Sequence, residues 1–156
     1  EALNPLAAWF LDQNQPDKAF PLLDRAEAGG FANADTYLMQ GRIHLIQNKR
    51  EEAIGDFETA LQLSQDPRRT LKAEGDIFML RGLFAEGIRA YEEGIRRHPD
   101  FAPNYLTLGS FFLSVEKPAK ALPLFKKALA CDLDPDTRKN VSEIVADLEK
   151  VTAAAE

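Results

Sequence analysis

Residues 105–112 read Tyr-Leu-Thr-Leu-Gly-Ser-Phe-Phe, and residues 121–128 read Ala-Leu-Pro-Leu-Phe-Lys-Lys-Ala. Gly109 in the first stretch is preceded by Gly75 and Gly41 at intervals of 34 residues. The large and small residues around these glycines recur at the same interval, with no insertion or deletion. Such a period indicates a tandem array, in which each unit is too small to bury its apolar face alone and shares a core with its neighbours.

Each unit of the array is predicted to be a helical hairpin. Large and small residues fall at the spacing of two amphipathic helices, namely Tyr105, Leu108 and Phe112, then Ala121, Phe125 and Ala128. Between the helices, one column holds Asn14, Asn48, Gly82 and Glu116. Asn and Gly accept the left-handed conformation that ends a helix, whereas Glu116 fits this position less well.

Prolines mark where several helices should begin. Asp66 precedes Pro67, and Asp134 precedes Pro135. An Asp at the N-cap followed by a Pro in the first turn is a typical helix start, so both pairs predict the beginning of a helix. Second helices are predicted to begin in a similar way at Pro16 and Pro118.

The columns resemble the tetratricopeptide repeat, whose signature is an aromatic residue, Leu-Gly, a second aromatic, a small Ala, a third aromatic and a late Pro. Residues 102–135 match it most fully, and Pro99 keeps the late Pro of the preceding unit. The departures from the signature are Gln40 and Glu74 at the Leu position, His44 at an aromatic position, and Gly87 and Gly94 at Ala positions. The resemblance implies a superhelix whose concave side is lined by the first helix of each unit.

The predicted fold is all-α, an α-α superhelix (solenoid) of about four helix-turn-helix repeats plus a C-terminal capping helix. We expect one domain over residues 1–156, with repeats at about 1–33, 34–67, 68–101 and 102–135 and an end helix at 136–151. Residues 152–156 are expected to fray. Glu1 is not an initiator Met and falls just inside a repeat, so we expect the sequence to be a segment of a longer chain.

Composition limits the classes of partner. A net charge of -6 and a pI near 5.0 disfavour nonspecific binding to nucleic acid. The single cysteine, Cys131, excludes an intramolecular disulfide and is interpreted as a small buried residue. A lone cysteine fits the reducing cytoplasm without excluding the periplasm, so the compartment stays open. The sequence contains no run of 18 apolar residues, so no membrane-spanning helix is predicted.

No residue pattern indicates an enzyme or a cofactor site. The two histidines are His44, in an aromatic core column, and His98, which precedes Pro99. Neither has a nucleophile at the spacing of a catalytic motif. We therefore interpret His44 as an imidazole that lines the core.

One acidic segment reproduces part of the ligand spacing of a calcium-binding loop, with Asp132, Asp134, Asp136 and Glu143. Thr137 stands where such a loop requires Gly, and Pro135 stiffens the segment. Helix capping is therefore the favoured interpretation, no metal site is predicted, and calcium binding remains the alternative.

We predict that a partner binds the face formed by the first helices. Helix phase gives an apolar floor with a basic centre, contributed by Leu38, Arg42, Leu45, Arg69, Lys72, Asp76, Met79, Leu106, Ser110 and Leu113. The same phase adds, toward the two ends, Asn4, Ala8, Leu11, Asn140 and Ile144. This mixture suits a peptide or helix whose apolar anchors meet the leucines and whose acidic groups meet Arg42 and Lys72.

A second candidate surface lies at the N-terminal end. Leu6 and Trp9 make the opening helix unusually apolar, and Trp9 has no predicted partner in the chain. An exposed indole beside aliphatic residues is typical of a contact site. Either a preceding repeat or another molecule would cover it.

These features predict a noncatalytic protein-protein interaction scaffold that binds a peptide or helix of a partner protein. One alternative is a self-assembly module, a homo-oligomer formed through its terminal helices. A second alternative is a repeat array that selects substrates for a larger enzyme.

Overall fold

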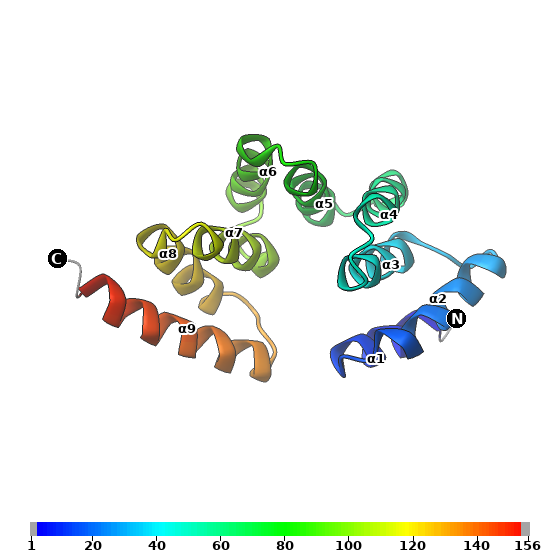
Figure 1. The fold of residues 1–156 in the computed structure, drawn as a ribbon, viewed down its shortest axis with the longest axis horizontal. Coiled ribbons are helices and arrows are strands. Elements are labelled where there is room, and N and C mark those ends of the chain that lie inside the picture. Colours follow the sequence, from blue (N-terminus) through cyan, green and yellow to red (C-terminus); the bar gives the residue numbers. More distant parts are fainter. Residues whose placement is uncertain (1–2, 154–156) are drawn as a thin grey trace. The chain divides into compact units, whose positions relative to one another are not determined.

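The computed structural model describes residues 3–153, and all regular structure in this range is helical (Figure 1). The helices are α1 (Leu3–Asp12), α2 (Pro16–Ala28), α3 (Ala34–Ile46), α4 (Arg50–Leu63), α5 (Pro67–Leu80), α6 (Phe84–Arg97), α7 (Ala102–Ser114), α8 (Pro118–Leu129) and α9 (Pro135–Ala153). They follow the predicted alternation of first and second helices, and α9 is the end helix.

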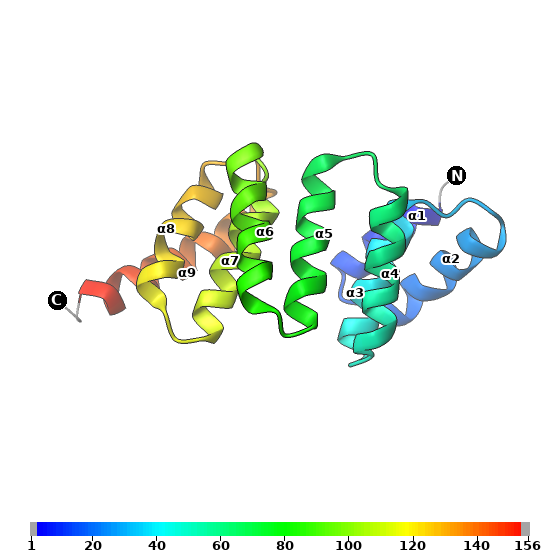
Figure 2. The same cartoon turned by 90° about the horizontal axis from the view of Figure 1, so that it is seen from above.

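The helices group into two compact units, and the boundary between them falls inside α6, after Gly87. In residues 3–87, α1 packs on α2, α3 on α4, and α4 on α5, which lies beside it in Figure 2. In residues 88–153, α7 packs on α8 and α8 packs on α9. Within each unit, neighbours in sequence are therefore neighbours in space, as the repeat period predicts.

The glycine column lies where the two helices of a hairpin approach most closely. A Cβ on Gly41 would lie 2.5 Å from the ring of Phe57, and a Cβ on Gly109 would lie 3.0 Å from the ring of Phe125. Both rings are buried. The first helix thus omits a side chain where the second inserts an aromatic one, and this exchange explains why the two columns repeat together.

A different exchange occurs between α6 and α7. Asn104 is fully buried (0% exposed), and neither of its amide atoms has a hydrogen-bond partner within the described residues. Gly94 faces this amide, because a Cβ built there would lie too close to Nδ2 and only 3.1 Å from Cγ. The departure of Gly94 from the Ala column is therefore explained by the volume of Asn104.

The turns between the two helices of a hairpin confirm the predicted left-handed column. The backbone φ angles are 55° at Asn14, 63° at Asn48, 76° at Gly82 and 57° at Glu116. Glu116 adopts this conformation although it carries a Cβ. Its own N–H donates to the Leu113 carbonyl at 3.0 Å, and the next N–H donates to the Phe112 carbonyl at 2.8 Å. These bonds satisfy carbonyls at the end of α7.

The predicted helix starts are also confirmed. The Asp66 carboxylate accepts a hydrogen bond from the Arg68 N–H at 3.0 Å, and the Asp134 carboxylate accepts one from the Thr137 N–H at 2.9 Å. Pro67 and Pro135 are the first residues of α5 and α9, and the second helices α2 and α8 begin at Pro16 and Pro118.

The predicted end of the last helix is wrong by two residues. We expected fraying from Thr152, but α9 continues to Ala153. The Thr152 hydroxyl donates to the Leu148 carbonyl at 2.9 Å, so this residue is held by the preceding turn. The rest of that prediction concerns residues 154–156, which lie outside the described residues.

Candidate partner-binding surfaces

In residues 3–87, α3 presents two of the predicted partner-binding residues to solvent. The Arg42 side chain is exposed, and Leu45 is 39% exposed one helical turn later. Within the described residues, the Arg42 guanidinium has no ion-pair partner. Leu38 differs from both, because it packs against a core cluster formed by Ala53, Ile54, Phe57 and Ile77. Arg42 and Leu45 therefore place a free cation beside an apolar side chain on the outer surface of α3.

The predicted basic centre on α5 is already paired with carboxylates of the chain. Arg69 forms ion pairs with Asp35, at the start of α3, and with Asp66 at 3.8 Å. Lys72 forms an ion pair with Asp76 one turn later, at 2.6 Å between Nζ and Oδ2. The Arg69–Asp35 pair is exposed and contributes only about 0–1 kcal/mol, so a partner's carboxylate can compete for Arg69, whereas the Lys72–Asp76 pair is half-buried.

Met79 packs inside the chain. A Cβ on Gly87 would lie 2.9 Å from Met79 Cγ and 3.0 Å from its sulfur, so the Met79 side chain fills the space that this glycine leaves. Met79 is half-buried as a result. Its side chain therefore offers a partner much less apolar surface than helix phase predicts.

In residues 88–153, α7 contributes the remaining predicted residues, and they differ in exposure. Ser110 is exposed, whereas Leu106 and Leu113 are half-buried. Leu113 packs against the cluster of Ala121, Phe125, Val141, Val145 and Leu148, and Leu106 packs against both this cluster and the one around Tyr105. The apolar residues of α7 thus serve the core and expose only part of their surface.

At the ends of the array the prediction for Leu11 is wrong, because its side chain is buried, and Ala8 and Ile144 are half-buried. Leu11 is a member of the first core cluster, with Leu23 and Ile43, and Ala8 packs against that cluster. Ile144 packs against the cluster beneath α9. Helix phase read from sequence shifts by a residue or two, and such a shift moves a side chain from the groove to the core.

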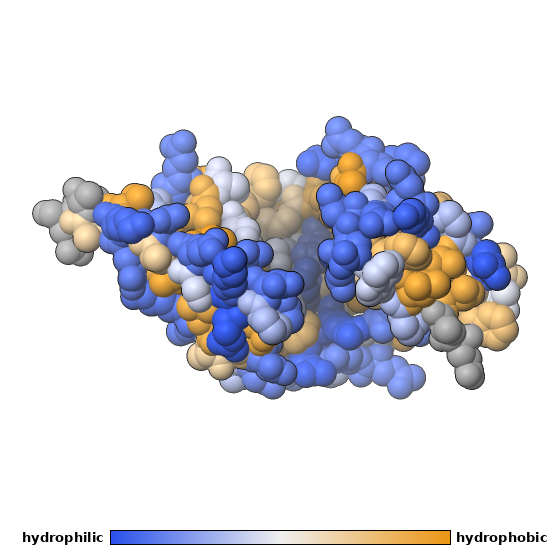
Figure 3. Space-filling view, turned by 90° about the horizontal axis from the view of Figure 1, so that it is seen from below, coloured by the Kyte–Doolittle hydropathy of each residue, from blue (hydrophilic) through white to orange (hydrophobic). Residues whose placement is uncertain are grey.

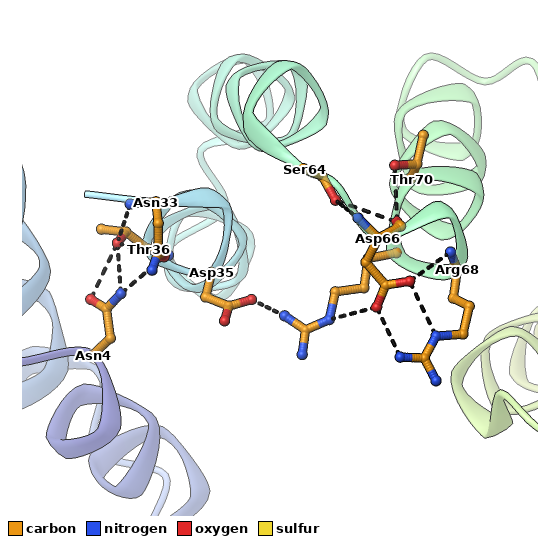
Figure 4. Close-up of polar contacts among 9 residues, drawn as sticks. Asn4, Asn33, Asp35, Thr36, Ser64, Asp66, Arg68 and Thr70 are labelled. Carbon is orange, nitrogen blue, oxygen red and sulfur yellow. Dashed lines mark hydrogen bonds and ion pairs between the residues drawn. The ribbon is translucent and has the colours of Figure 1, made fainter. Parts of the chain in front are cut away.

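Asn4 is occupied by a polar network that joins α1 to the start of α3 (Figure 4). Its Nδ2 donates to Asn33 Oδ1 at 3.0 Å and to Thr36 Oγ1 at 2.9 Å. The Asn33 N–H donates to Thr36 Oγ1, and the Thr36 N–H donates to Asn33 Oδ1, which is a capping box. The Asn4 amide therefore supports the cap of α3.

The N-terminal surface keeps large apolar side chains exposed. Trp9 is 54% exposed and Leu6 is 44% exposed, and Figure 3 shows apolar surface gathered over the N-terminal helices. The Trp9 ring contacts Phe10 edge-on, with centroids 5.0 Å apart. Phe31 is 66% exposed and lines a hollow with Leu3, Asn4, Pro5, Ala26, Asn33 and Asp35. Sequence reasoning missed Phe31, because it follows Gly30 in a loop outside the repeat columns.

Two tetratricopeptide repeat models match the sequence, one at residues 34–67 and one at residues 72–137. Together these matches cover more than half of the chain. The chain belongs to the tetratricopeptide repeat family. Tetratricopeptide repeat protein 13 of Homo sapiens is 28% identical over 80 residues, which are 51% of this chain and 9% of that protein. The chain thus spans only a small part of this relative.

Solved structures confirm the predicted class, an α-α solenoid of tetratricopeptide repeats. A thermophilic tetratricopeptide repeat protein of Thermus thermophilus has a TM-score of 0.75 at 16% identity, over 96% of this chain and 81% of that one. PilF of Pseudomonas aeruginosa has a TM-score of 0.68 at 20% identity, over 98% and 68%. MamA of Desulfovibrio magneticus has a TM-score of 0.56 at 16% identity, over 97% and 94%. At these identities the similarity shows the fold alone.

His44, the departure at an aromatic position of the tetratricopeptide repeat, is half-buried between helices. Its Nδ1 lies 2.7 Å from Asp56 Oδ2 on α4, and its ring lies 5.5 Å from that of Phe20 on α2. Burial raises the pKa of Asp56 above its ordinary value, although the contact with His44 acts in the opposite direction. Sequence reasoning placed His44 against the core and missed Asp56, whose only signal is that it precedes the aromatic column at Phe57.

The acidic segment between the last repeat and α9 serves as a helix cap. Hydrogen bonds from Thr137 lower the pKa of Asp134. Within residues 3–153, no group of three or more His, Cys, Asp or Glu side chains could hold a metal ion. Cys131 is buried, as predicted, and burial raises the pKa of its thiol. None of the helices in the described range is long and apolar enough to cross a membrane.

Proposed function

We propose that this scaffold, which as a tetratricopeptide repeat array serves protein interaction in general, binds an acidic and apolar segment of a partner on the outer face of α3 and α5. The observation that carries the proposal is the pair on α3, where the unpaired cation of Arg42 stands one turn from the exposed Leu45. A partner carboxylate near Arg42 and an apolar side chain on Leu45 would match this pair.

Lys72 and Arg69 on α5 extend the basic character of this face. Their present carboxylate partners, Asp76 and Asp35, form partly exposed ion pairs. A partner carboxylate can replace Asp35 at little cost, because this exposed pair is worth at most about 1 kcal/mol. In residues 88–153, we assign a separate contact to α7, through Ser110 and the exposed parts of Leu106 and Leu113.

Rigid display is the mechanism that we propose for recognition. The helices are assembled before the partner arrives, so binding immobilises few side chains and specificity follows from the spacing of the contacts. No catalytic role is assigned to any of these residues.

The test is quantitative affinity capture from a lysate of the source organism. Arg42→Glu with Lys72→Glu should weaken the capture of specific partners by about tenfold or more, because each reversal replaces an attraction by a repulsion. Helicity should stay unchanged, and the melting temperature should fall only slightly, since Lys72→Glu places two like charges one turn apart on α5. A matched control is Lys49→Glu with Arg50→Glu, which makes the same charge change at the N-cap and first residue of α4. Equal loss of capture in both double variants would refute the proposed face.

A second candidate function, self-assembly through the N-terminal end, is favoured by the exposure of Trp9 and Leu6. Burying both side chains against another copy would remove apolar surface from water. Sedimentation at high protein concentration tests this candidate. A monomer that Trp9→Ser leaves unaltered would exclude it.

A further inference from the structure

The outer face of α8 carries a lysine stripe in a chain whose net charge is -6. The exposed side chains of this helix and its N-cap include four lysines, and α8 contains no acidic residue. Lys126 forms an ion pair with Glu149 of α9 at 2.6 Å. Within residues 3–153, the other three, Lys117, Lys120 and Lys127, have no ion-pair partner.

These three lysines share one side of the helix. Successive residues of an α-helix are rotated by about 100°, so Lys117, Lys120 and Lys127 fall within a stripe about 80° wide. Lys120 and Lys127 are two turns apart, which is about 10 Å along the axis. The stripe is flanked by the small exposed residues Ala119, Pro123 and Ala130, which let another chain approach the helix closely.

Helix electrostatics does not account for the first half of the stripe. The N-terminus of a helix carries a partial positive charge and favours acidic residues, which the other second helices provide: Asp17 in α2, Glu51 and Glu52 in α4, and Glu86 in α6. In α8 the N-cap is Lys117, which makes no side-chain capping bond, and Lys120 lies in the first turn. Two cations therefore stand where an anion is favoured.

Lys120 has one further contact, which provides an internal control. Its Nζ lies 5.6 Å from the centroid of the Phe112 ring, and Lys18 makes the same contact with Phe10 at 5.6 Å. Lys18, however, belongs to α2, which also carries Asp17, Asp24 and Glu27. The ring contact explains the position of the Lys120 side chain. Because α8 carries no carboxylate, the positive charge of Lys120 remains unbalanced.

We infer that the lysine stripe of α8, Lys117, Lys120 and Lys127, docks an acidic segment of a partner protein. Charge complementarity selects the occupant, because a row of carboxylates would balance all three cations and the unfavourable N-terminal charge at once. This surface is distinct from the face of α3 and α5 to which the proposed function is assigned.

Two other anionic partners fit the stripe less well. A lipid surface would need apolar side chains that insert beside the lysines, and none of the exposed large apolar residues lies in α8. Single-stranded nucleic acid would need aromatic or Arg side chains for stacking, and the exposed stripe has neither. The acidic remainder of the chain would also repel a long polyanion.

The probe for the experiment is a fluorescein-labelled peptide of alternating Glu and Gly residues, long enough to span α8. Its binding to the full chain is measured by fluorescence anisotropy at physiological salt. The triple change Lys117→Gln, Lys120→Gln and Lys127→Gln should weaken binding by about tenfold or more, since three charge pairs are lost. A peptide with Gln in place of Glu should not bind.

The matched control removes three positive charges elsewhere, through Lys18→Gln, Lys49→Gln and Arg50→Gln. It has the same net charge as the stripe variant and loses the equivalent ring contact, so it should bind the peptide within about twofold of the unmodified chain. Circular dichroism checks that both variants keep their helicity.

Three results would overturn the inference. The first is a difference of less than twofold between the two triple variants. The second is tighter binding of phosphatidylglycerol vesicles or of a single-stranded oligonucleotide than of the peptide, through the same lysines. The third is a stable dimer that only the stripe variant dissociates, since a second copy of the chain would then be the occupant. The proposed function is tested separately, by capture with Arg42→Glu and Lys72→Glu, so failure of the stripe does not decide it.

Discussion

Thr36 and Asn104 occupy the same column of the repeat, two periods apart, and both are completely buried. Around Thr36, every polar group is used: its hydroxyl accepts from the Asn4 amide and from the Asn33 N–H. Around Asn104, neither amide atom has a hydrogen-bond partner within the described residues. One column thus holds a satisfied polar residue in one repeat and an unsatisfied one in another.

The comparison teaches that the repeat preserves volume more strictly than polarity. The column that contains Gly94 holds Ala in the other repeats, at positions 26, 60 and 128. The amide of Asn104 extends one atom further from the backbone than the side chain of Thr36, and the methyl group missing from Gly94 makes room for it. Core packing tolerates such an exchange when the total volume is kept.

The largest expected effect comes from refilling this space. Gly94→Ala should lower the free energy of unfolding by about 1–3 kcal/mol, because the new methyl group would overlap the buried Asn104 amide. Adding Asn104→Ala should recover much of the loss, since the smaller side chain leaves room for the new methyl group. A double-mutant cycle in urea, followed by circular dichroism, measures this coupling.

Gly55→Ala is the matched control for that experiment. Gly55 also lies inside a helix, but nothing lies within 4 Å of a Cβ placed there. This change should therefore raise the free energy of unfolding by about 0.5–1 kcal/mol, through helix propensity alone. If Gly94→Ala stabilised the chain to the same extent, the volume exchange between Gly94 and Asn104 would be disproved.

A smaller effect, of opposite sign in the two repeats, should follow from removing the polar groups themselves. Thr36→Val should lower the free energy of unfolding by about 1 kcal/mol, since Asn4 and Asn33 lose a partner. Asn104→Leu, which keeps the side-chain shape, should raise it by about 1 kcal/mol, because no buried amide then lacks a hydrogen bond. Chemical denaturation of the two variants measures both changes in the free energy of unfolding. Changes of the same sign would show that the two buried polar residues do not differ in this way.

The smallest effect concerns His44 and Asp56, the half-buried polar pair between α3 and α4. A carboxyl whose pKa is raised by folding binds its proton more tightly in the folded chain. Its contribution to stability is therefore present below the ordinary Asp pKa of 3.8 and is lost as the pH rises through the raised value. Asp56→Asn should flatten this part of the curve of unfolding free energy against pH. If the slope of the unfolding free energy against pH above 3.8 is the same in this variant, Asp56 does not cause the pH dependence.

The sequence predicted the parts of this fold that one repeat period determines. Column residues such as Gly41 and Glu116 occupy positions set by the geometry of a single hairpin, so their roles followed from the 34-residue spacing. Even the unfavourable Glu116 adopts the left-handed conformation, because the hydrogen bonds at the end of α7 require it.

Contacts between repeats were harder to predict. The ion pair of Arg69 on α5 with Asp35 on α3 depends on side-chain directions that periodicity does not give. The burial of Leu11 follows from a small shift of helix phase. The exposed Arg42 and Leu45 lie where the sequence placed them, on the outside of α3, and whether they bind a partner is for the capture experiment to decide.

The next member of the column of Thr36 and Asn104, 34 residues after Asn104, is Arg138, and its side chain is exposed. Its guanidinium donates to the Leu129 carbonyl at 2.7 Å and to the Cys131 carbonyl at 3.0 Å, so that a side chain of α9 completes the end of α8. A fragment cut at the repeat boundary would therefore lack Arg138, which lies about one helical turn into α9 and bonds the carbonyls at the end of α8. Anyone excising, grafting or extending this array would have to cut after the opening turn of the following helix.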